Sequence, residues 1–84
     1  MQYVVYMVRC ADNSLYTGIT TDITRRINQH NGVRPDGSRY TRSRRPVTLV
    51  YTKNTRSKAM ALRLEARIKS KSKTLKEQLI SRQG

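Results

Sequence analysis

The hydrophobic positions at the start of the chain form two short runs separated by a polar turn. Residues 3–9 (YVVYMVR) are mostly β-branched or aromatic and contain no breaker, which predicts a well-buried strand. Residues 14–20 (SLYTGIT) predict a second strand. Ala11-Asp12-Asn13 between them has turn chemistry, because Asp and Asn side chains bond their own backbone. The pattern therefore predicts an antiparallel hairpin over residues 3–20.

The register of this hairpin decides whether its two central tyrosines meet. A two-residue loop would place Tyr6 and Tyr16 on opposite faces of the sheet. A three-residue loop over residues 11–13 would pair Val8 with Tyr16. It would also pair Tyr6 with Gly18, and so bring both tyrosines to one face. The sequence leaves both registers open.

A helical pattern follows the hairpin. Thr21 or Asp22 is a candidate N-cap, and the helix is expected to end at about Asn31, before Gly32. At 100° per residue, four side chains fall within an arc of ~100°, namely Ile23, Arg26, Ile27 and His30. Three others point elsewhere, namely Arg25, Asn28 and Gln29. Because the isoleucines must face the sheet, Arg26 and His30 are expected at the edge of the core.

The next segment has no periodicity. Residues 32–46 (GVRPDGSRYTRSRRP) contain two prolines, two glycines and five arginines, which predicts a long loop that is either functional or disordered. Residues 47–52 (VTLVYT) then predict a third strand.

Two helices complete the chain. The first is predicted to start at Thr55 or Ser57 and to end at about Ser70, and the second to span about residues 73–81. The element order β-β-α-β-α-α predicts a single domain over residues 1–84. Its fold class is α+β, with a three-stranded, mainly antiparallel sheet flanked by helices.

Charge identifies the class of partner. Eighteen Lys and Arg against five Asp and Glu give a formal net charge of +13. Self-repulsion on this scale opposes compaction, so a polyanionic partner is expected, with nucleic acid first and an anionic membrane second. The longest apolar run, residues 4–8, is far shorter than the ~20 residues of a spanning helix, so no membrane association is expected.

Two further observations concern the cellular compartment and the use of cysteine. The N-terminus lacks the basic region, apolar run and cleavage site of a signal peptide, so the cytoplasm is expected. Cys10 is the single cysteine, which excludes an internal disulfide and a cysteine-based zinc cluster.

One of the five carboxylates lacks a routine structural role. Glu65 falls on the apolar side of its helix, between Ala61 and Leu62 on the helical wheel. A carboxylate there must be paired or must coordinate a cation, because burying it alone is costly. The plain structural interpretation is an ion pair with Lys69 or with Arg26. The other four carboxylates have expected turn, capping or surface roles, and they are Asp12, Asp22, Asp36 and Glu77.

Several of these residues form a spaced pattern over most of the chain. In order, its parts are Val4-Val5-Tyr6, Tyr16-Thr17-Gly18, Arg26, His30 and the helical Glu65. The arrangement resembles the GIY-YIG nuclease family from Tyr3 to about Ile80, and most closely its short stand-alone bacterial members. Val4 stands where the first motif has glycine, and Thr17 where the second has isoleucine. No asparagine follows Glu65, as it does in some members, and Gln78 is only a weak substitute.

The resemblance implies a fold and a set of roles. The fold would be GIY-YIG-like, and the catalytic residues would be Tyr6, Tyr16, Arg26, His30 and Glu65. Gly18 would be the motif glycine, which allows close approach of the backbone. Glu65 would be the single metal-binding carboxylate, with Mg²⁺ or Mn²⁺ as the cofactor. Both tyrosines would line the site, which requires the three-residue hairpin loop.

Phosphodiester hydrolysis is the chemistry that such a set could perform. Arg26 could stabilise the charge that gathers on the phosphate oxygens. A tyrosine acting as the general base needs a pKa below its usual ~10, and a cationic site pushes the pKa in that direction. Tyr6, Tyr16 or His30 could take this role, and a tyrosine is favoured.

Two functions are therefore expected, one catalytic and one not. The first is a metal-dependent endonuclease that acts on DNA, in preference to RNA, in repair or processing. The alternative is a non-catalytic basic nucleic-acid-binding protein on the same scaffold. In either case a set of cations would hold the nucleic-acid backbone, comprising Arg34, Arg39, Arg42, Arg44, Arg45, Lys69, Lys71 and Lys73. The oligomeric state is left open.

Overall fold

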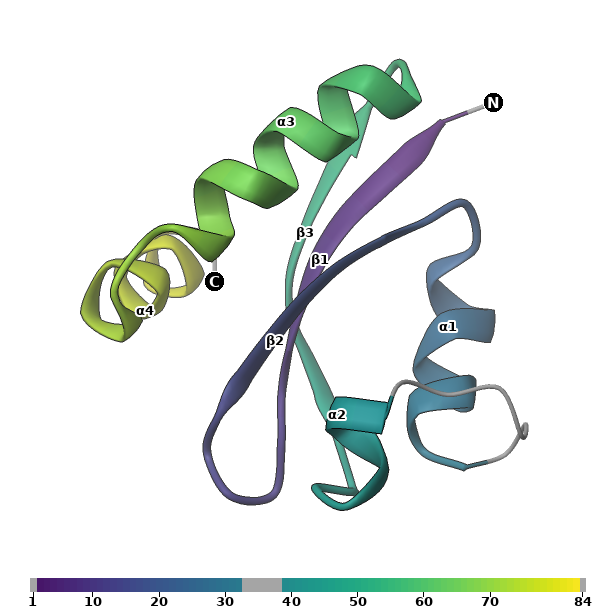
Figure 1. Cartoon of the computed structure of the whole chain (residues 1–84), viewed down its shortest axis with the longest axis vertical. Coiled ribbons are helices and arrows are strands. Elements are labelled where there is room, and N and C mark those ends of the chain that lie inside the picture. Colours follow the sequence, from purple (N-terminus) through teal and green to yellow (C-terminus); the bar gives the residue numbers. More distant parts are fainter. Residues whose placement is uncertain (1, 33–38, 84) are drawn as a thin grey trace.

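A three-stranded antiparallel sheet forms the centre of the molecule in a computed structural model that describes residues 2–32 and 39–83 (Figure 1). Its strands are β1 (Tyr3–Arg9), β2 (Leu15–Thr20) and β3 (Thr48–Thr55), in the spatial order β2-β1-β3. The helices are α1 (Ile23–His30), α2 (Arg39–Arg42), α3 (Lys58–Lys69) and α4 (Lys73–Gln83). The predicted α+β order is confirmed, with α2 as a short addition inside the predicted loop.

The hairpin adopts the register of the three-residue loop. Tyr6 pairs with Gly18 and Val8 pairs with Tyr16, so the two tyrosines lie on the same face of the sheet. Asn13 closes the turn with a φ of 69°, a conformation that asparagine tolerates better than most residues. The register that the sequence left open is thus settled in favour of the one that brings the tyrosines together.

The central strand β1 is buried on both faces, and each face has its own core. Val5 and Met7 pack with Ala61 and Ile68 of α3 on one face. On the other face a second cluster packs against α1, and it contains Tyr6, Val8, Cys10 and Val47 with Tyr16, Ile23 and Ile27 around it. In Figure 1, α3 and α4 accordingly lie on one side of the strands, and α1 and α2 on the other. Alternation along β1 therefore assigns Tyr6 to the α1 face.

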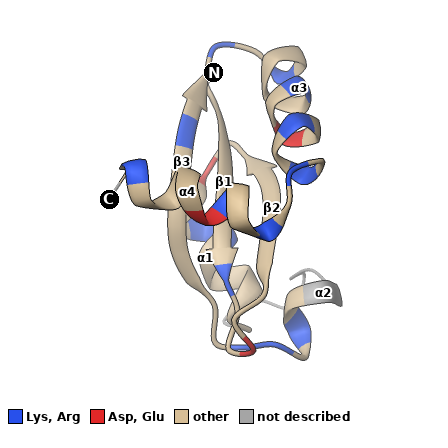
Figure 2. Ribbon diagram, turned by 90° about the vertical axis from the view of Figure 1, so that its left-hand side faces the viewer, with Lys and Arg blue, Asp and Glu red and all other residues tan. Residues whose placement is uncertain are grey.

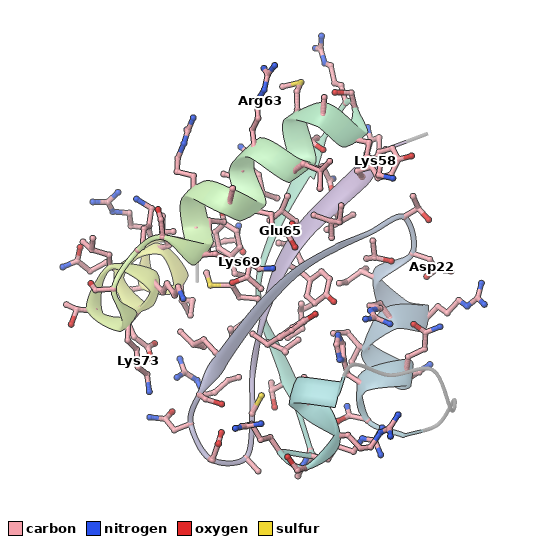
Figure 3. The ribbon with its side chains drawn as sticks, in the orientation of Figure 1. Asp22, Lys58, Arg63, Glu65, Lys69 and Lys73 are labelled. Carbon is pink, nitrogen blue, oxygen red and sulfur yellow. The ribbon has the colours of Figure 1, made fainter. Side chains whose placement is uncertain are left out.

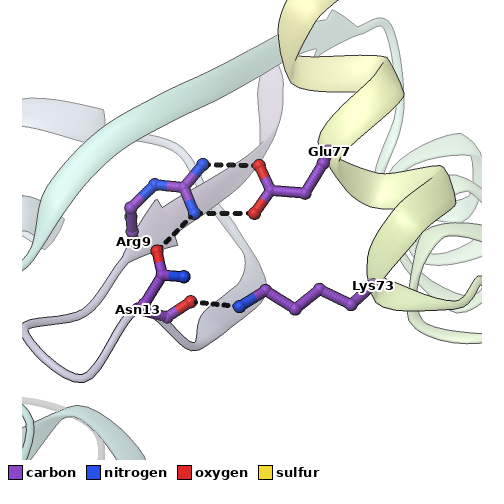
Figure 4. A network of polar contacts seen from close by, with 4 residues as sticks. All are labelled: Arg9, Asn13, Lys73 and Glu77. Atoms are coloured by element: carbon purple, nitrogen blue, oxygen red, sulfur yellow. Dashed lines mark hydrogen bonds and ion pairs between the residues drawn. The ribbon is translucent and has the colours of Figure 1, made fainter.

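A polar network docks α4 against the hairpin (Figure 4). The two terminal nitrogens of Arg9 donate to the two carboxylate oxygens of Glu77 at 2.6 and 2.7 Å. Lys73 donates to the backbone oxygen of Asn13 at 2.7 Å. The expectation of an outward-facing Glu77 is wrong, because the carboxylate turns toward β1 to meet Arg9.

The end of α4 reaches the outer edge of β3. The backbone N–H of Thr52 donates to the side-chain oxygen of Gln83 at 2.8 Å, and the Gln83 amide donates back to the carbonyl of Thr52. The glutamine thus takes the place of a neighbouring strand at one position of this edge. Within the described ranges, no helix combines the length and the apolar character needed to cross a membrane.

Candidate active site

The site is built around the hydroxyl group of Tyr6, which lies under the backbone of Gly18. Tyr6 is 1% exposed. A Cβ atom added at Gly18 would lie 2.6 Å from the Tyr6 hydroxyl oxygen and 2.8 Å from its Cζ. Glycine is therefore required here because the tyrosine of the facing strand occupies the space of a side chain. The predicted close approach of the backbone is made to Tyr6.

Gly18→Ala is expected to destabilise the fold by about 1–3 kcal/mol, because a buried tyrosine flanked by packed residues must shift to admit the methyl group.

The neighbouring substitution Thr17→Val is expected to stabilise the fold. The Thr17 hydroxyl is buried and has no hydrogen-bond partner within the described residues, so its removal relieves a desolvation penalty. Urea unfolding of both variants measures the two effects. Equal stability of Gly18→Ala and the wild type would contradict the close contact.

Helix α1 supplies the residues that contact this hydroxyl. Asp22 caps the helix by accepting from the backbone N–H of Arg25 at 3.1 Å. Ile23 and Ile27 then pack against the sheet, and this orientation turns Arg26 and His30 toward Tyr6. The predicted facing of Arg26 and His30 is confirmed, whereas the prediction that Gln29 points elsewhere is wrong, because Gln29 is buried. His30 is fully buried, deeper than its predicted place at the edge of the core.

A chain of hydrogen bonds runs through the buried part of the site. Arg26 Nε donates to the Tyr6 oxygen at 3.3 Å, and this oxygen lies 2.8 Å from His30 Nε2. His30 Nδ1 lies 2.7 Å from the Thr41 hydroxyl oxygen. Since Tyr6 accepts from Arg26, its own proton is best directed at His30 Nε2. His30 then carries its proton on Nδ1 and donates to Thr41.

Burial and charge set the protonation states along this chain. Burial raises the pKa of Tyr6, although the hydrogen bond and charge of Arg26 oppose the rise. Burial also lowers the pKa of His30 to about 4, with further contributions from the charges of Arg26 and Arg45. His30 is therefore neutral near pH 7. The expected lowering of the tyrosine pKa by a cationic site does not occur at Tyr6, because desolvation outweighs the charge.

Acidification is expected to destabilise the fold through His30. The pKa of His30 is about 4 in the folded protein, against 6.5 for a histidine side chain free in water. Between these values the unfolded chain binds the extra proton, so stability falls as the pH drops through this window, by at most ~1.4 kcal/mol per pH unit. Urea midpoints at pH 7.5 and pH 5 measure the loss. His30→Gln is expected to show a smaller difference between the two pH values than the wild type, and an equal difference would contradict this origin.

Tyr16 occupies the more accessible side of the same cluster. Its ring meets the His30 ring edge-on, with centroids 5.2 Å apart and planes at 65°. It is half-buried, whereas Tyr6 and His30 are buried. Burial lowers the pKa of Arg26, but hydrogen bonds and charge interactions with Tyr6 and Tyr16 outweigh it, so the net shift is upward. Tyr16 and Arg26 are thus electrostatic partners.

Glu65 approaches this cluster from α3. Figure 3 shows Glu65 and Lys69 on the side of α3 that faces the sheet, whereas Arg63 points away. The Glu65 side chain is 18% exposed, and its carboxylate lies 3.3 Å from the Lys69 ammonium, as in the plain structural interpretation. After burial and the charge of Tyr16, the charge of Glu65 is a further cause of the raised pKa of Tyr6. The charge of the carboxylate is therefore felt at Tyr6.

Glu65 offers carboxylate oxygens, which fit a hard cation that takes few of its ligands from the protein. Among the described residues, no three His, Cys, Asp or Glu side chains gather in a metal-binding group. A single carboxylate suits Mg²⁺, because this ion keeps several water ligands and takes others from phosphate. Mn²⁺ accepts the same oxygen ligands. Glu65 is the residue that would hold either ion.

Besides Lys69, which pairs with Glu65, three of the predicted phosphate-binding cations have structural partners. Arg44 pairs with Asp12 at 3.0 Å. Arg45 Nε donates to the backbone oxygen of His30 at 2.6 Å, which caps the carboxyl end of α1. Lys73 holds the hairpin turn, as described above.

The remaining cations of that set have different environments. Lys69 pairs with Glu65, Lys71 is half-buried, and Arg42 is exposed. Arg34 and the side chain of Arg39 lie outside the described residues.

Two residues of the site were not predicted. Thr41 is fully buried against His30. Gln29 is 7% exposed and accepts from Arg26 Nη1 at 2.9 Å, although the helical wheel points it elsewhere. The i,i+3 spacing of Arg26 and Gln29 was an available signal. Thr41 gave none, because it lies in a segment without periodicity.

Comparison with known proteins identifies the family. The family model described as the GIY-YIG catalytic domain matches residues 2–78. The chain belongs to the GIY-YIG family. It is 53% identical over 78 residues to a UPF0213 protein of Desulfotalea psychrophila, covering 93% of this chain and 70% of that protein. It is 49% identical over 75 residues to a UPF0213 protein of Halobacterium salinarum, covering 89% and 95%.

A solved GIY-YIG relative has the same fold. The solution NMR structure of the UPF0213 protein BH0048 from Bacillus halodurans matches with a TM-score of 0.65 at 45% identity. The match covers 100% of this chain and 87% of that one. GIY-YIG membership makes this a domain of a nuclease family whose expected substrate is nucleic acid.

Proposed function

We propose that the protein is a metal-dependent endonuclease that hydrolyses phosphodiester bonds of DNA, in repair or processing, in the cytoplasm. One observation carries the proposal. Side chains from both strands of the hairpin and from α1 meet around the Tyr6 hydroxyl, and they are Tyr6, Tyr16, Arg26 and His30. Glu65 of α3 turns toward the sheet, and its charge contributes to the raised pKa of Tyr6. A domain that only bound a polyanion would have no need to direct a carboxylate toward this cluster.

Arg26 is suited to stabilise the charge of the transition state. Its Nε contacts Tyr6 and its Nη1 contacts Gln29, so the guanidinium is oriented before substrate arrives. A fixed guanidinium presents donors to the phosphate oxygens without reorganisation as charge develops on them. Its raised pKa keeps it charged at every physiological pH.

Tyr16 is the best placed general base. Tyr6 and His30 are buried, and the Tyr6 hydroxyl is already hydrogen-bonded to His30 Nε2 and to Arg26 Nε. The Tyr16 oxygen would take a proton from the attacking water while the water oxygen bonds to phosphorus. The ester bond to the leaving oxygen breaks, and this oxygen takes a proton from solvent. Tyr6, His30 and Thr41 then act as positioning residues that hold Arg26 and the Tyr16 ring.

Glu65 would hold Mg²⁺ or Mn²⁺ beside the scissile phosphate. The bound ion would supply Lewis-acid stabilisation of the phosphate and of the leaving oxygen. The Lys69 ammonium, 3.3 Å from the carboxylate, keeps Glu65 paired when no ion is bound.

That same ion pair supports the second candidate function, a non-catalytic nucleic-acid-binding protein. The charge of the Glu65 carboxylate is already compensated by the Lys69 ammonium, so the carboxylate requires no metal ion. A net charge of +13 would give affinity for any polynucleotide. The two functions differ in whether phosphodiester bonds are broken.

Incubation with supercoiled plasmid, branched DNA, single-stranded DNA and RNA tests the choice. Each substrate is mixed with protein in Mg²⁺, in Mn²⁺ or in EDTA, beside Glu65→Ala and Arg26→Ala variants. The nuclease proposal predicts cleavage of DNA with either metal, none in EDTA and none by the variants. Binding without cleavage of any substrate would leave the binding function in its place. Cleavage of RNA alone would overturn the assignment to DNA.

A further inference from the structure

A second concave surface lies at the opposite edge of the sheet from Tyr16 and Gly18. The strand order β2-β1-β3 makes β2 and β3 the two edges, and the candidate active site uses β2. Between β3 and α3 lies a pocket of about 580 Å³. It is lined by Lys53, Asn54, Thr55 and Arg56 from β3 and the residue after it, and by Met60, Arg63, Leu64 and Arg67 from α3.

The helical spacing of α3 separates this pocket from the active site. Its four lining residues on α3 follow the i, i+3, i+4, i+7 pattern of one helical stripe. Arg63 and Arg67 each lie two residues from Glu65, a rotation of roughly 200° around the helix. In Figure 3, Arg63 accordingly points away from the side that carries Glu65. One helix therefore contributes to two surfaces.

The pocket concentrates positive charge that has no local compensation. Four of its eight lining residues are cationic, namely Lys53, Arg56, Arg63 and Arg67. None of the four forms an ion pair with a carboxylate in the part of the chain that the structure describes. Figure 2 shows Lys and Arg on both β3 and α3 along this side of the molecule. Like charges gathered around one pocket repel one another, and an anionic ligand removes that cost.

The pocket is also partly apolar, which indicates the class of anion. Met60, one of the lining residues, is 50% exposed. Leu64 adds an apolar wall inside the pocket. A ligand made only of phosphate would make no apolar contact with these side chains. Unstacked nucleobases would, because their faces pack on apolar and sulfur-containing side chains while cations hold the backbone.

The pocket begins beside the position where α4 covers the edge of β3. Gln83 of α4 covers the edge at Thr52, and the pocket begins at the next residue, Lys53. A volume of 580 Å³ lies within the range of ~300–1,000 Å³ of small-ligand sites, which is suited to one or two nucleotides. Duplex DNA keeps its bases stacked inside, so it could offer this pocket only its backbone.

We propose that the pocket between β3 and α3 binds a single-stranded segment of the nucleic acid on which the protein acts. The cations would hold successive phosphates, and Met60 with Leu64 would contact the bases. The proposal rests on the proposed function, because it assumes a nucleic-acid ligand. It deepens that function by assigning a preference for substrates that carry a single-stranded region.

Binding of fluorescent single-stranded DNA and RNA, measured in EDTA over a salt series, tests the proposal. The variant Arg63→Gln/Arg67→Gln removes two cations of the pocket. The matched control Lys76→Gln/Arg82→Gln removes two cations from α4 and gives the same net charge. The pocket variant is expected to bind roughly tenfold more weakly near 0.1 M salt, with a log–log salt slope smaller by about 1.4, as for two lost phosphate contacts. The control is expected to remain within about twofold.

A second variant isolates contact with the bases. Met60→Gln keeps the length of the side chain and changes no charge. It is expected to weaken single-strand binding severalfold and to leave duplex binding unchanged, because only the single strand exposes its base faces. The DNA and RNA arms show whether the pocket accepts both sugars.

The outcomes separate this proposal from the nuclease. If the pocket variant and the control bind single strands equally, the pocket proposal is overturned, whatever happens to plasmid cleavage. If Met60→Gln weakens duplex and single strand alike, the base contacts are overturned. If the wild type binds single strands as expected but cuts no DNA, the nuclease proposal fails while the pocket stands.

Discussion

Glu65→Gln is expected to reduce metal-dependent cleavage of DNA by about 10³-fold. The substitution keeps the shape of the side chain and removes the charge of the carboxylate that would hold the metal ion. Loss of this ion removes several kcal/mol of transition-state stabilisation, and each ~1.4 kcal/mol is a factor of ten in rate. The measurement is the single-turnover rate of plasmid nicking, with protein in excess, across a Mg²⁺ titration.

Lys69→Gln serves as the control for this substitution. It breaks the same ion pair, at 3.3 Å, from the other side and leaves the carboxylate in place. If the ion pair mattered only for structure, the two variants would lose activity equally. The proposed role of Glu65 predicts that Lys69→Gln stays within severalfold of the wild type and needs no more Mg²⁺. Equal losses in both variants would contradict that role.

Arg26→Lys is expected to lower the cleavage rate by about 10²–10³-fold, with little loss of binding. Lysine keeps the charge but cannot contact Tyr6 and Gln29 from two nitrogens while it presents further donors to a phosphate. Loss of one such pre-organised donor group costs this much in comparable sites. Single-turnover rates and separate binding curves in EDTA measure the two effects.

Arg25→Lys is the matched control, since Arg25 is the exposed neighbour of Arg26 on α1. It is expected to change the cleavage rate by less than about twofold. A similar fall in both variants would show that any arginine of α1 contributes only through its charge. That outcome would contradict a specific role for Arg26.

The sequence predicted most of the architecture, because hydrophobic periodicity determines which residues face the sheet. The bounds of β1 and the facing of Arg26 and His30 followed from this pattern alone. The hairpin register did not, since one residue in the loop decides it. The positive φ of Asn13 belongs to the three-residue turn that brings Tyr16 opposite Val8.

The environment of the arginines could not be predicted from the sequence. Arg44 meets Asp12 across 32 positions of chain, and Arg45 caps α1 from 15 positions beyond His30. Such contacts depend on how the segment after α1 returns to the hairpin, and no local pattern encodes that path. Composition correctly marked this segment as basic, but it could not show which cations serve the fold.

The helical spacing of α3 distinguishes two sides of the helix, but it does not show what either side contacts. On the helical wheel Glu65 lies on the apolar side, and Arg63 and Arg67 each lie roughly 200° around the helix from it. Only the structure shows that Arg63 and Arg67 line a pocket together with Lys53 and with Arg56, which follows β3. A tertiary contact thus converted a solvent-facing stripe into one wall of a pocket.

Nicking of supercoiled plasmid by the wild type and by Glu65→Gln, compared at equal DNA occupancy in Mg²⁺, tests the central claim most directly. The claim is that residues of the hairpin, α1 and α3 form one hydrolytic site. It predicts that the wild type converts the plasmid to nicked and linear forms, and that Glu65→Gln binds equally well but leaves it supercoiled. An intact plasmid with the wild-type protein, or equal nicking by both proteins, would contradict the claim.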